Sequence, residues 1–239
     1  MESGTGDPVW RSDSKVQRIA VIAALDLEAK ILRDVLPDGG GPIYVSGPGS
    51  VRAEATAQQA IAAGAQGLIA WGLAGGINRA AATGTVILPA NILGDAGEWP
   101  TAVTWRARLA EVLRQRYRLI EEPLFSADHV IAAPAAKAVL AARTGAAAVD
   151  MESAGVAAAA AKAGMPCVVL RVIADGPDDA LPDNIETLVT ADGRTNYRGL
   201  LPFVVSPRRF SQLLRLARRS RSARRVLGEV ARLLGEGAP

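Results

Sequence analysis

The chain has 239 residues, of which 49% are apolar and 21% are charged, a composition typical of a globular protein with a sizeable core. It contains one Cys, Cys167, and one His, His129, so it can form neither an intrachain disulfide nor a zinc site built from Cys and His. Catalysis would therefore rest on carboxylates, hydroxyls, arginines and backbone amides, and we expect no metal and no organic cofactor.

The net charge of +3 conceals two parts of opposite sign. Residues 194–239 contain eleven Arg and two acids, a net charge of +9. Residues 1–193 contain 16 basic and 22 acidic residues, a net charge of −6. The sequence thus predicts an acidic body followed by a basic C-terminal tail.

Three parts are expected along the chain: a disordered polar leader at residues 1–16, one domain at residues 17–193, and a basic helical extension at residues 194–239 packed on that domain. The leader has no apolar run of signal-peptide length. No segment reaches the roughly 18 consecutive apolar residues of a membrane span. These features predict a cytoplasmic protein.

Short apolar runs alternate with segments of helical period through the expected domain. Strands that alternate with helices predict an α/β fold with a largely parallel central sheet. In chain order, strands are expected at residues 18–24, 43–46, 67–71, 85–88, 146–150 and 166–173, and helices at residues 51–63, 105–117, 134–142 and 152–163.

Polar or glycine-rich segments follow most of these strands. Ligands of open α/β sheets bind beyond the carboxyl ends of the strands, so the residues just after each strand are the candidates for a site. They are Asp26 and Glu28, the turn Gly47–Gly49, the turn Gly72–Gly76, Asp150 to Glu152, and Asp175.

Each candidate also has a purely structural interpretation. Asp26 and Glu28 are two residues apart and do not share a helix face, so at most one of them points into a site, and either could simply complement a helix dipole. Gly72–Gly76 suits close approach to a ligand or a crossing of two chain segments. Asp150 could cap a helix. Asp175 ends a strongly apolar strand, where desolvation raises a carboxyl pKa and allows it to donate a proton.

Three motifs in this order carry a resemblance to a known family: Gly72–Gly76 (GLAGG), Val149–Ser153 (VDMES) and Arg171–Asp175 (RVIAD). They resemble those of the nucleoside phosphorylase and methylthioadenosine/adenosylhomocysteine nucleosidase superfamily, over about residues 18 to 180. The resemblance implies a three-layer phosphorylase/hydrolase-like α/β fold whose central sheet is mixed and largely parallel, followed here by C-terminal basic helices.

Further segments are most similar to the hopanoid-associated phosphorylases, which are thought to remove adenine from adenosylhopane. These segments are residues 135–153 and 178–182, together with the Arg-rich tail. The resemblance therefore implies adenosylhopane as the substrate, and hopanoid biosynthesis as the setting.

The resemblance also implies roles for individual residues. Asp175 matches the aspartate that protonates the purine at N7 as it leaves. Glu152 matches the glutamate that hydrogen-bonds the ribose hydroxyls, and Met151 lies against the sugar. His129 and Val130 fall in the segment that lines the base pocket. Ala74 and Gly75 would flank the base as well.

The residue types suit the cleavage of an N-ribosidic bond. Breaking this bond builds positive charge on the sugar and negative charge on the departing purine. A carboxylate near the ribose stabilises the first charge, and a protonated Asp neutralises the second. The logic is close to that of the carboxylate pairs of glycosidases.

The choice between phosphate and water as the nucleophile stays open. Superfamily membership favours phosphorolysis, with inorganic phosphate as co-substrate, but Leu73 stands where many relatives have a phosphate-binding hydroxyl. Glu28, with Asp26 beside it, resembles the nucleosidase turn whose glutamate activates water. Arg52 could supply positive charge to a phosphate, or lie on a solvated helix surface. Gly47, Gly49 and Gly72 would border the phosphate or the water, together with Leu73.

The basic tail has helical periodicity, with one apolar face and a dense cluster of arginines. It fits a helix docked on the body, or an interfacial helix on anionic lipid at the inner face of the membrane. Nucleic acid is not expected, because the cluster lacks interleaved aromatic residues. The apolar positions are Phe210, Leu213, Leu214, Ala217, Leu227, Val230, Ala231 and Leu234, and the cluster is Arg215, Arg218, Arg219, Arg221, Arg224 and Arg225.

The function expected from the sequence is cleavage of the N-ribosyl bond of an adenosine-containing small molecule or adenosyl-lipid, with release of adenine. The enzymatic alternative is a methylthioadenosine/adenosylhomocysteine nucleosidase. The alternative of another class is a non-catalytic nucleoside-binding or membrane-associated scaffold. The resemblance further implies a homo-oligomer.

Overall fold

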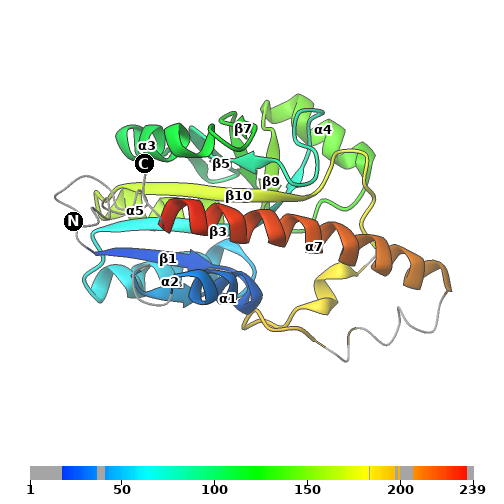
Figure 1. The fold of residues 1–239 in the computed structure, drawn as a ribbon, viewed down its shortest axis with the longest axis horizontal. Helices are drawn as coiled ribbons and strands as arrows, with labels where there is room; N and C mark the ends of the chain where they lie inside the picture. Colours follow the sequence, from blue (N-terminus) through cyan, green and yellow to red (C-terminus); the bar gives the residue numbers. More distant parts are fainter. Residues whose placement is uncertain (1–17, 37–40, 183, 197–198, 200–206, 236–239) are drawn as a thin grey trace, which may run out of the picture.

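The computed structural model describes residues 18–36, 41–182, 184–196, 199 and 207–235. The expected leader at residues 1–16 lies outside the described residues. Helices cover both faces of one ten-stranded sheet (Figure 1). The sheet carries an apolar core on each face, one under α1, α3 and α7 and the other under α2 and α5. The three-layer α/β fold implied by the resemblance is therefore confirmed.

The sheet is mixed, with parallel strands at its centre. β1 (Ile19–Ala23) pairs in parallel with β2 (Ile43–Val45) and β3 (Gly67–Gly76), and β3 pairs in parallel with β10 (Cys167–Asp175). On its other edge β3 is antiparallel to β9 (Ala148–Asp150). The carboxyl ends of β1, β3 and β10 thus meet at one edge, which is where a site is expected.

The remaining strands are short and extend the sheet on both sides. β5 and β6 form an antiparallel hairpin, β5–β8, β8–β9 and β4–β7 pair in parallel, and β4 is antiparallel to β10. These strands are β4 (Val86–Ile87), β5 (Asn91–Gly94), β6 (Gly97–Pro100), β7 (Leu119–Ile120) and β8 (Leu124–Ser126).

Six α-helices are present in the described part of the chain. They are α1 (Asp26–Val35), α2 (Ser50–Ala62), α3 (Val103–Leu113), α4 (Pro134–Thr144), α5 (Ser153–Lys162) and α7 (Pro207–Gly235), and a short 3-10 helix, η1 (Ile185–Leu188), follows β10. None of the described helices is long and apolar enough to span a bilayer.

The glycine-rich segment is not the turn that the sequence predicts. β3 continues through Gly72–Gly76, because its pairing with β10 runs on to Gly75 and its pairing with β9 begins there. Gly76 lies where two chain segments cross, since a Cβ on it would be 2.0 Å from the carbonyl oxygen of Ala81. The segment is thus a strand that needs glycine for close packing.

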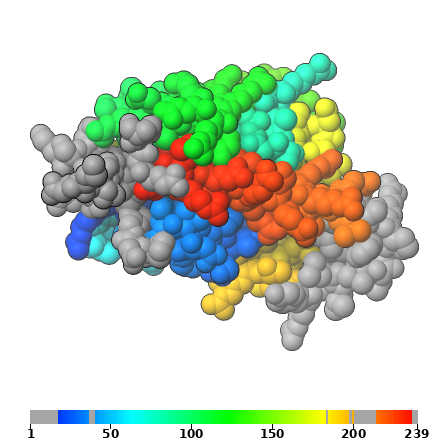
Figure 2. Space-filling view, viewed as in Figure 1, coloured from blue at the N-terminus to red at the C-terminus, as the bar shows by residue number. Residues whose placement is uncertain are grey.

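Helix α7 lies across the face of the sheet between α1 and α3 (Figure 2). Its C-terminal half packs into the core through Ala223, Leu227, Val230, Ala231 and Leu234. Leu214 and Ala217, which the sequence placed on the same apolar face, are exposed. Among the side chains that the structure describes, the helix therefore docks by its second half, and the predicted apolar positions Phe210 and Leu213 lie outside these side chains.

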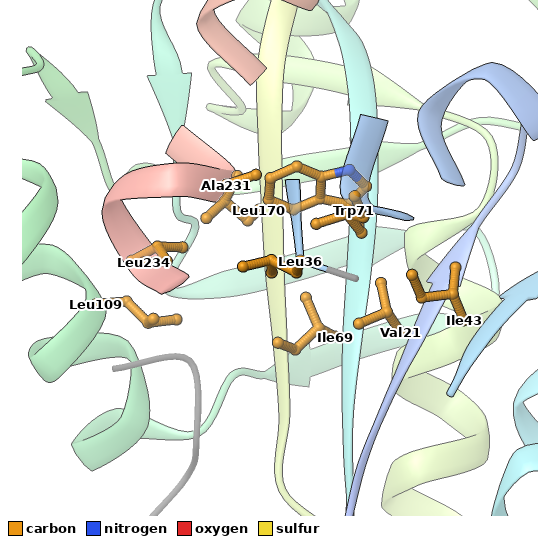
Figure 3. A pocket seen from close by; sticks show the side chains of 10 residues that line it. Val21, Leu36, Ile43, Ile69, Trp71, Leu109, Leu170, Ala231 and Leu234 are labelled. Carbon is orange, nitrogen blue, oxygen red and sulfur yellow. The ribbon is translucent and has the colours of Figure 1, made fainter. Parts of the chain in front are cut away.

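An apolar cavity of about 30 Å³ remains under this docked half (Figure 3). The surface of this cavity is entirely apolar, so it offers no hydrogen-bond partner to a water molecule and no reactive group for catalysis. Its lining residues are Val21, Leu32, Leu36, Ile43, Ile69, Trp71, Leu109, Leu170, Ala231 and Leu234.

Candidate active site

A cleft of about 440 Å³ opens where the carboxyl ends of the central strands meet. Its floor comes from residues at the ends of β1, β3, β9 and β10. Its walls come from residues 129–131, before α4, and from residues 181–191, which carry η1. Among the described residues, a large cleft thus lies at the carboxyl ends of the central strands, where the sequence predicts a site.

A buried guanidinium organises the part of this cleft that contains Glu152. Arg171, in the middle of β10, is 1% exposed and forms an ion pair with Asp150, at 2.8 Å from Nη2 to Oδ2. Asp150 also accepts hydrogen bonds from the backbone N–H of Glu152 (3.3 Å) and Ser153 (3.2 Å), so it caps α5 as its structural interpretation predicts. The ion pair fixes the junction that presents Glu152.

Two more buried carboxylates share the charge of Arg171. Glu28 and Glu152 both act electrostatically on this guanidinium, whose Nε and Nη1 have no hydrogen-bond partner among the described residues. Gly72 leaves room for both side chains, because a Cβ on it would lie 2.5 Å from Oε1 of Glu28 and 2.6 Å from Nη1 of Arg171. Three carboxylates therefore surround one cation at this end of the cleft.

Backbone amides hold both glutamates in place. Glu28 accepts hydrogen bonds from Leu73 N–H, at 2.8 Å to Oε1, and from Leu25 N–H, at 3.0 Å to Oε2. Glu152 accepts one from Gly49 N–H, at 3.0 Å to Oε1. No described residue donates a hydrogen bond to Oε2 of Glu152, so this oxygen remains available to a ligand in the cleft.

Burial raises the pKa of both glutamates. For Glu28, the charge of Arg171 and the backbone hydrogen bonds that the carboxylate accepts oppose this rise in pKa. Burial, and next the charge of Asp150, raise the pKa of Glu152 to about 7. Both groups thus hold protons much more readily than exposed carboxylates do.

Asp175 also lines the cleft, at the end of β10, and is 6% exposed. Its Oδ2 forms an ion pair with Lys137, a fully buried lysine of α4. Burial raises the pKa of Asp175, and the positive charge of Lys137 opposes this effect. The cleft thus carries a further protonatable carboxyl, whose charged neighbours differ from those of the Arg171 cluster.

Comparison with known proteins places the chain in a family. A family model described as the phosphorylase superfamily matches residues 35–198, more than half of the chain. The chain belongs to the phosphorylase superfamily. A search of curated proteins finds no significant match.

Solved structures of superfamily type share this fold. The 5'-methylthioadenosine/S-adenosylhomocysteine nucleosidase of Helicobacter pylori is 19% identical, with a TM-score of 0.68 over 90% of this chain and 97% of that one. The futalosine hydrolase of Helicobacter pylori is 19% identical, with a TM-score of 0.69 over 92% and 97%. The nucleosidase of Neisseria meningitidis is 17% identical, with a TM-score of 0.67 over 91% and 99%. The chain is an enzyme of the nucleoside phosphorylase and nucleosidase type, as predicted.

Most of the residues predicted for the site of this superfamily member come together in the cleft. Glu28, Met151, Glu152 and Asp175 line it, and so do the residues predicted around the base and the nucleophile. These further residues are Arg52, Leu73, Ala74, Gly75, His129 and Val130. The side chain of His129 is 73% exposed and contacts Asp128, so the cleft meets only part of it.

Asp26 does not join them. Its side chain is 57% exposed and pairs with Arg33 at 3.4 Å, and it is not among the residues that line the cleft. Two positions along a helix turn a side chain to another face, so Glu28 points inward and Asp26 points to solvent. The catalytic role predicted for Asp26 is therefore withdrawn.

The glycines predicted around the nucleophile act through the backbone. Gly72 makes room for Glu28 and Arg171, and Gly49 donates to Glu152. Gly47, at a φ of +74°, passes so close to Ala191 that a Cβ would lie 2.0 Å from its carbonyl oxygen. These three glycines shape the cleft without being among its lining residues.

The sequence did not single out two of the buried charges around the cleft. Arg171 and Lys137 lie within segments that carry the resemblance, but neither was predicted to have a role in the site. The signal for Arg171 is a charged residue in the middle of an apolar strand, and for Lys137 it is a position three residues before Leu140, on the buried face of α4. Charges at such positions are seldom left unpaired, so each indicated a carboxylate partner nearby.

Proposed function

We propose that this enzyme cleaves the N-ribosyl bond of an adenosine-containing substrate and releases adenine. The observation that carries the proposal is that one cleft is lined by two carboxyl groups with different charged partners. Asp175, paired with Lys137, would protonate the departing purine, and Glu152, beside Arg171, would hold the ribose and stabilise the positive charge that builds on it. Met151, beside Glu152 in the cleft lining, would contact the sugar.

Water is the nucleophile that the site favours. Phosphate carries negative charge, and Glu28, Asp150 and Glu152 share only the one cation of Arg171. The amides of Gly49 and Leu73, which could otherwise bind an anion, already donate to carboxylates. Glu28 would instead take a proton from the attacking water.

Phosphorolysis, which superfamily membership favours, remains the second candidate. Arg52 supports it, because it is the one Lys or Arg among the described residues that line the cleft. Its Nη1 donates to the carbonyl oxygen of Pro48 at 3.1 Å, and its side chain is otherwise exposed. A phosphate at the cleft mouth could pair with it.

An apolar 5' substituent fits the outer wall of the cleft. Ile131, Leu181, Ile185 and Val189 lie there, so the wall offers hydrocarbon beyond the sugar. Both substrates under consideration share this property: adenosylhopane, implied by the resemblance to hopanoid-associated phosphorylases, and methylthioadenosine, named for structural neighbours of the chain.

An adenine-release assay tests the proposal. The purified protein is incubated with adenosine, methylthioadenosine, adenosylhomocysteine and an adenosyl-lipid, each with and without inorganic phosphate. We expect release without phosphate, fastest for a substrate with an apolar 5' group. A strict need for phosphate would establish phosphorolysis, and nucleoside binding without turnover of any substrate would establish a non-catalytic scaffold.

The exposed side of α7 supports a peripheral association with anionic lipid. Arg215, Arg218 and Arg221 are exposed and form no ion pair with a described residue. Leu214, 44% exposed, lies beside them on the same helix. An arginine face with an apolar residue suits a negatively charged membrane surface, and it would bring the enzyme close to a lipid substrate.

A further inference from the structure

Lys137 is buried without any contact with solvent, and its ammonium is fully used. Besides the ion pair with Oδ2 of Asp175, Nζ donates to the carbonyl oxygens of Gly176 (2.8 Å) and Asp179 (3.1 Å). An ammonium group has three protons, so each of them has a partner. The lysine is therefore fixed in one position against one oxygen of Asp175.

The other oxygen of Asp175, Oδ1, has no hydrogen-bond donor in the part of the chain that the structure describes. Asp175 also lines the cleft. The two oxygens thus have separate surroundings, since Oδ2 faces a cation in the protein interior and Oδ1 remains available to a ligand. The carboxyl group cannot rotate without breaking the ion pair.

Stability alone does not explain this pair. Burying two opposite charges costs a large desolvation penalty, and apolar side chains of similar volume often serve a core equally well or better. Lys137 contacts the one carboxyl group that ends β10 in the cleft, from the helix that directly follows the His129 loop. This placement points to the chemistry of the cleft.

We propose that Lys137 is a positioning residue for the leaving-group acid: it directs Oδ1 of Asp175 toward the purine and stabilises the carboxylate that Asp175 becomes. This inference rests on the proposed function. As the bond between C1' and N9 breaks, its electron pair moves into the purine and the proton on Oδ1 moves to N7. Lys137 keeps its three protons throughout, and solvent later returns a proton to Asp175.

The charges around Asp175 come from three segments. Lys137 belongs to α4, Asp179 to the turn after β10, and Arg219 to α7. Arg219 pairs with Oδ1 of Asp179 at 2.7 Å, and Oδ2 of Asp179 accepts the N–H of Gly176 at 2.9 Å. Lys137 is the only one of these groups that contacts Asp175 directly, so removing its charge should change Asp175 most.

Neutral variants separate the charge of Lys137 from its hydrogen bonds. Lys137→Gln keeps donors for the two carbonyl groups, Lys137→Met keeps neither, and Lys137→Arg keeps the charge. We expect both neutral variants to lower kcat by roughly 10²-fold, because the forming carboxylate loses its cation. Lys162→Gln, an exposed lysine of α5 that pairs with Glu54, is the control and should leave kcat unchanged.

The pH profile distinguishes this role from a structural one. Without the cation the pKa of Asp175 rises, so the acid stays protonated to higher pH. The basic limb of kcat/KM should therefore move up by roughly one to three pH units in Lys137→Gln and Lys137→Met. Lys137→Arg should keep the wild-type limb. A fall in kcat with an unmoved limb would overturn the proposal.

A second substrate gives an independent measure. A 4-nitrophenyl riboside with the same 5' group as the best nucleoside needs no proton on its leaving group. The neutral variants should cleave it at nearly the wild-type rate while losing activity on the nucleoside. Equal losses on both substrates would show that Lys137 only supports the fold.

A measurement on the wild-type protein covers the case in which the neutral variants do not fold. The Nζ signal of Lys137 in a nitrogen-15 spectrum is identified by its absence from the spectrum of Lys137→Arg, and slow exchange distinguishes it from the exposed Lys30 and Lys162. We expect it to shift with pH at the midpoint of the basic limb of kcat/KM. A signal that does not respond there would refute the coupling. If the wild type cleaves no nucleoside, the proposed function fails, and the signal still reports whether Lys137 senses a titrating Asp175.

Discussion

Glu152 is buried beside the carboxylate of Asp150, so its ionisation should change the free energy of unfolding by a measurable amount. Its pKa lies at about 7, above the ordinary value of 4.5. Between these values the folded protein holds a proton that the unfolded chain releases. The contribution of Glu152 to the free energy of unfolding is therefore present at low pH and is lost as pH rises through this window, by on the order of 3 kcal/mol.

Glu152→Gln cannot ionise, so it should remove this loss. We expect the free energy of unfolding of the variant to fall less than that of the wild type between about pH 5 and about pH 8, by roughly 3 kcal/mol. Urea unfolding at the two pH values measures the difference. Glu54→Gln, on the surface of α2, is the control and should follow the wild type. Parallel curves for Glu152→Gln and the wild type would contradict the prediction.

Glu28 and Asp26 form a natural pair of test and control within the first turn of α1. If water is the nucleophile, Glu28→Gln should lower adenine release by about 10²- to 10⁴-fold, because it removes the base. Asp26→Asn should leave the rate nearly unchanged, since Asp26 faces solvent. Equal effects in the two variants, measured by steady-state kinetics, would exclude Glu28 as the base.

Asp175 has a comparable control in Asp178, three residues further along. Asp175→Asn should slow adenine release by about 10²- to 10⁴-fold, because an amide cannot supply the proton to N7. Asp178 is exposed and outside the cleft lining, so Asp178→Asn should retain activity. Near-normal release by Asp175→Asn would remove it from the acid role.

The sequence predicted the site residues where a motif or a strand end marked them. Glu152 and Asp175 belong to two of the superfamily's motifs, and Glu28 belongs to a turn after a strand that resembles the nucleosidase turn. The position of Lys137 depends on which face of α4 is buried, and the Ala-rich sequence of that helix barely distinguishes its faces. The ion pair of Lys137 with Asp175 joins residues 38 positions apart, and only the fold brings them together.

At the scale of elements, α2 and α5 pack at unusually short range. Both helices place alanines at the contact, and a Cβ on Gly155 would lie 2.1 Å from the carbonyl oxygen of Ser50. Ser50 follows Gly49, whose amide holds Glu152. The close packing of these two helices therefore also sets the position of Glu152 in the cleft.

Two glycine-to-alanine substitutions in helices should have opposite effects. Gly155→Ala should destabilise the protein by roughly 1–3 kcal/mol, because the methyl group meets the backbone of α2. Gly228→Ala in α7 should stabilise it by up to about 1 kcal/mol, since its methyl group makes an ordinary contact, 3.6 Å from Cγ2 of Ile31. Urea unfolding measures both changes. A stabilising Gly155→Ala would contradict the close packing.

Elements with clear periodicity were predicted well, and short ones were missed. The apolar runs of β1 and β10 and the helical pattern of α2 gave bounds within two residues. Strand β6 is mostly exposed, and β5 has only Ile92 and Leu93 between its polar and glycine ends, so no apolar run in the hairpin indicated strands. Residues Gly72–Gly76 looked like a turn because glycine disfavours strands, whereas packing against Glu28 and Arg171 requires glycine there.

At the scale of the whole molecule, the concentration of positive charge on α7 predicts that this helix is the surface that binds an anionic membrane. We expect the wild type to bind vesicles that contain phosphatidylserine at low salt. Reversal of Arg215, Arg218 and Arg221 to Glu should weaken binding by more than about 10²-fold, at roughly 1 kcal/mol for each lost arginine.

A matched control reverses Arg114, Arg116 and Arg118, which follow α3 and give the same change in net charge. Co-sedimentation at low and high salt measures both proteins. If the two triple variants lose binding equally, net charge rather than the face of α7 governs the association. If the wild type does not bind at low salt, the lipid proposal is wrong.

The late position of α7 in the chain has a consequence for biosynthesis. Ala223, Leu227, Val230, Ala231 and Leu234 complete the core over β3 and β10, yet they are translated after every strand. At about 5–20 residues per second, a ribosome holds the nascent sheet with this face uncovered for seconds. During that interval the exposed hydrocarbon would attract chaperones or other nascent chains, and release of α7 from the exit tunnel would end it.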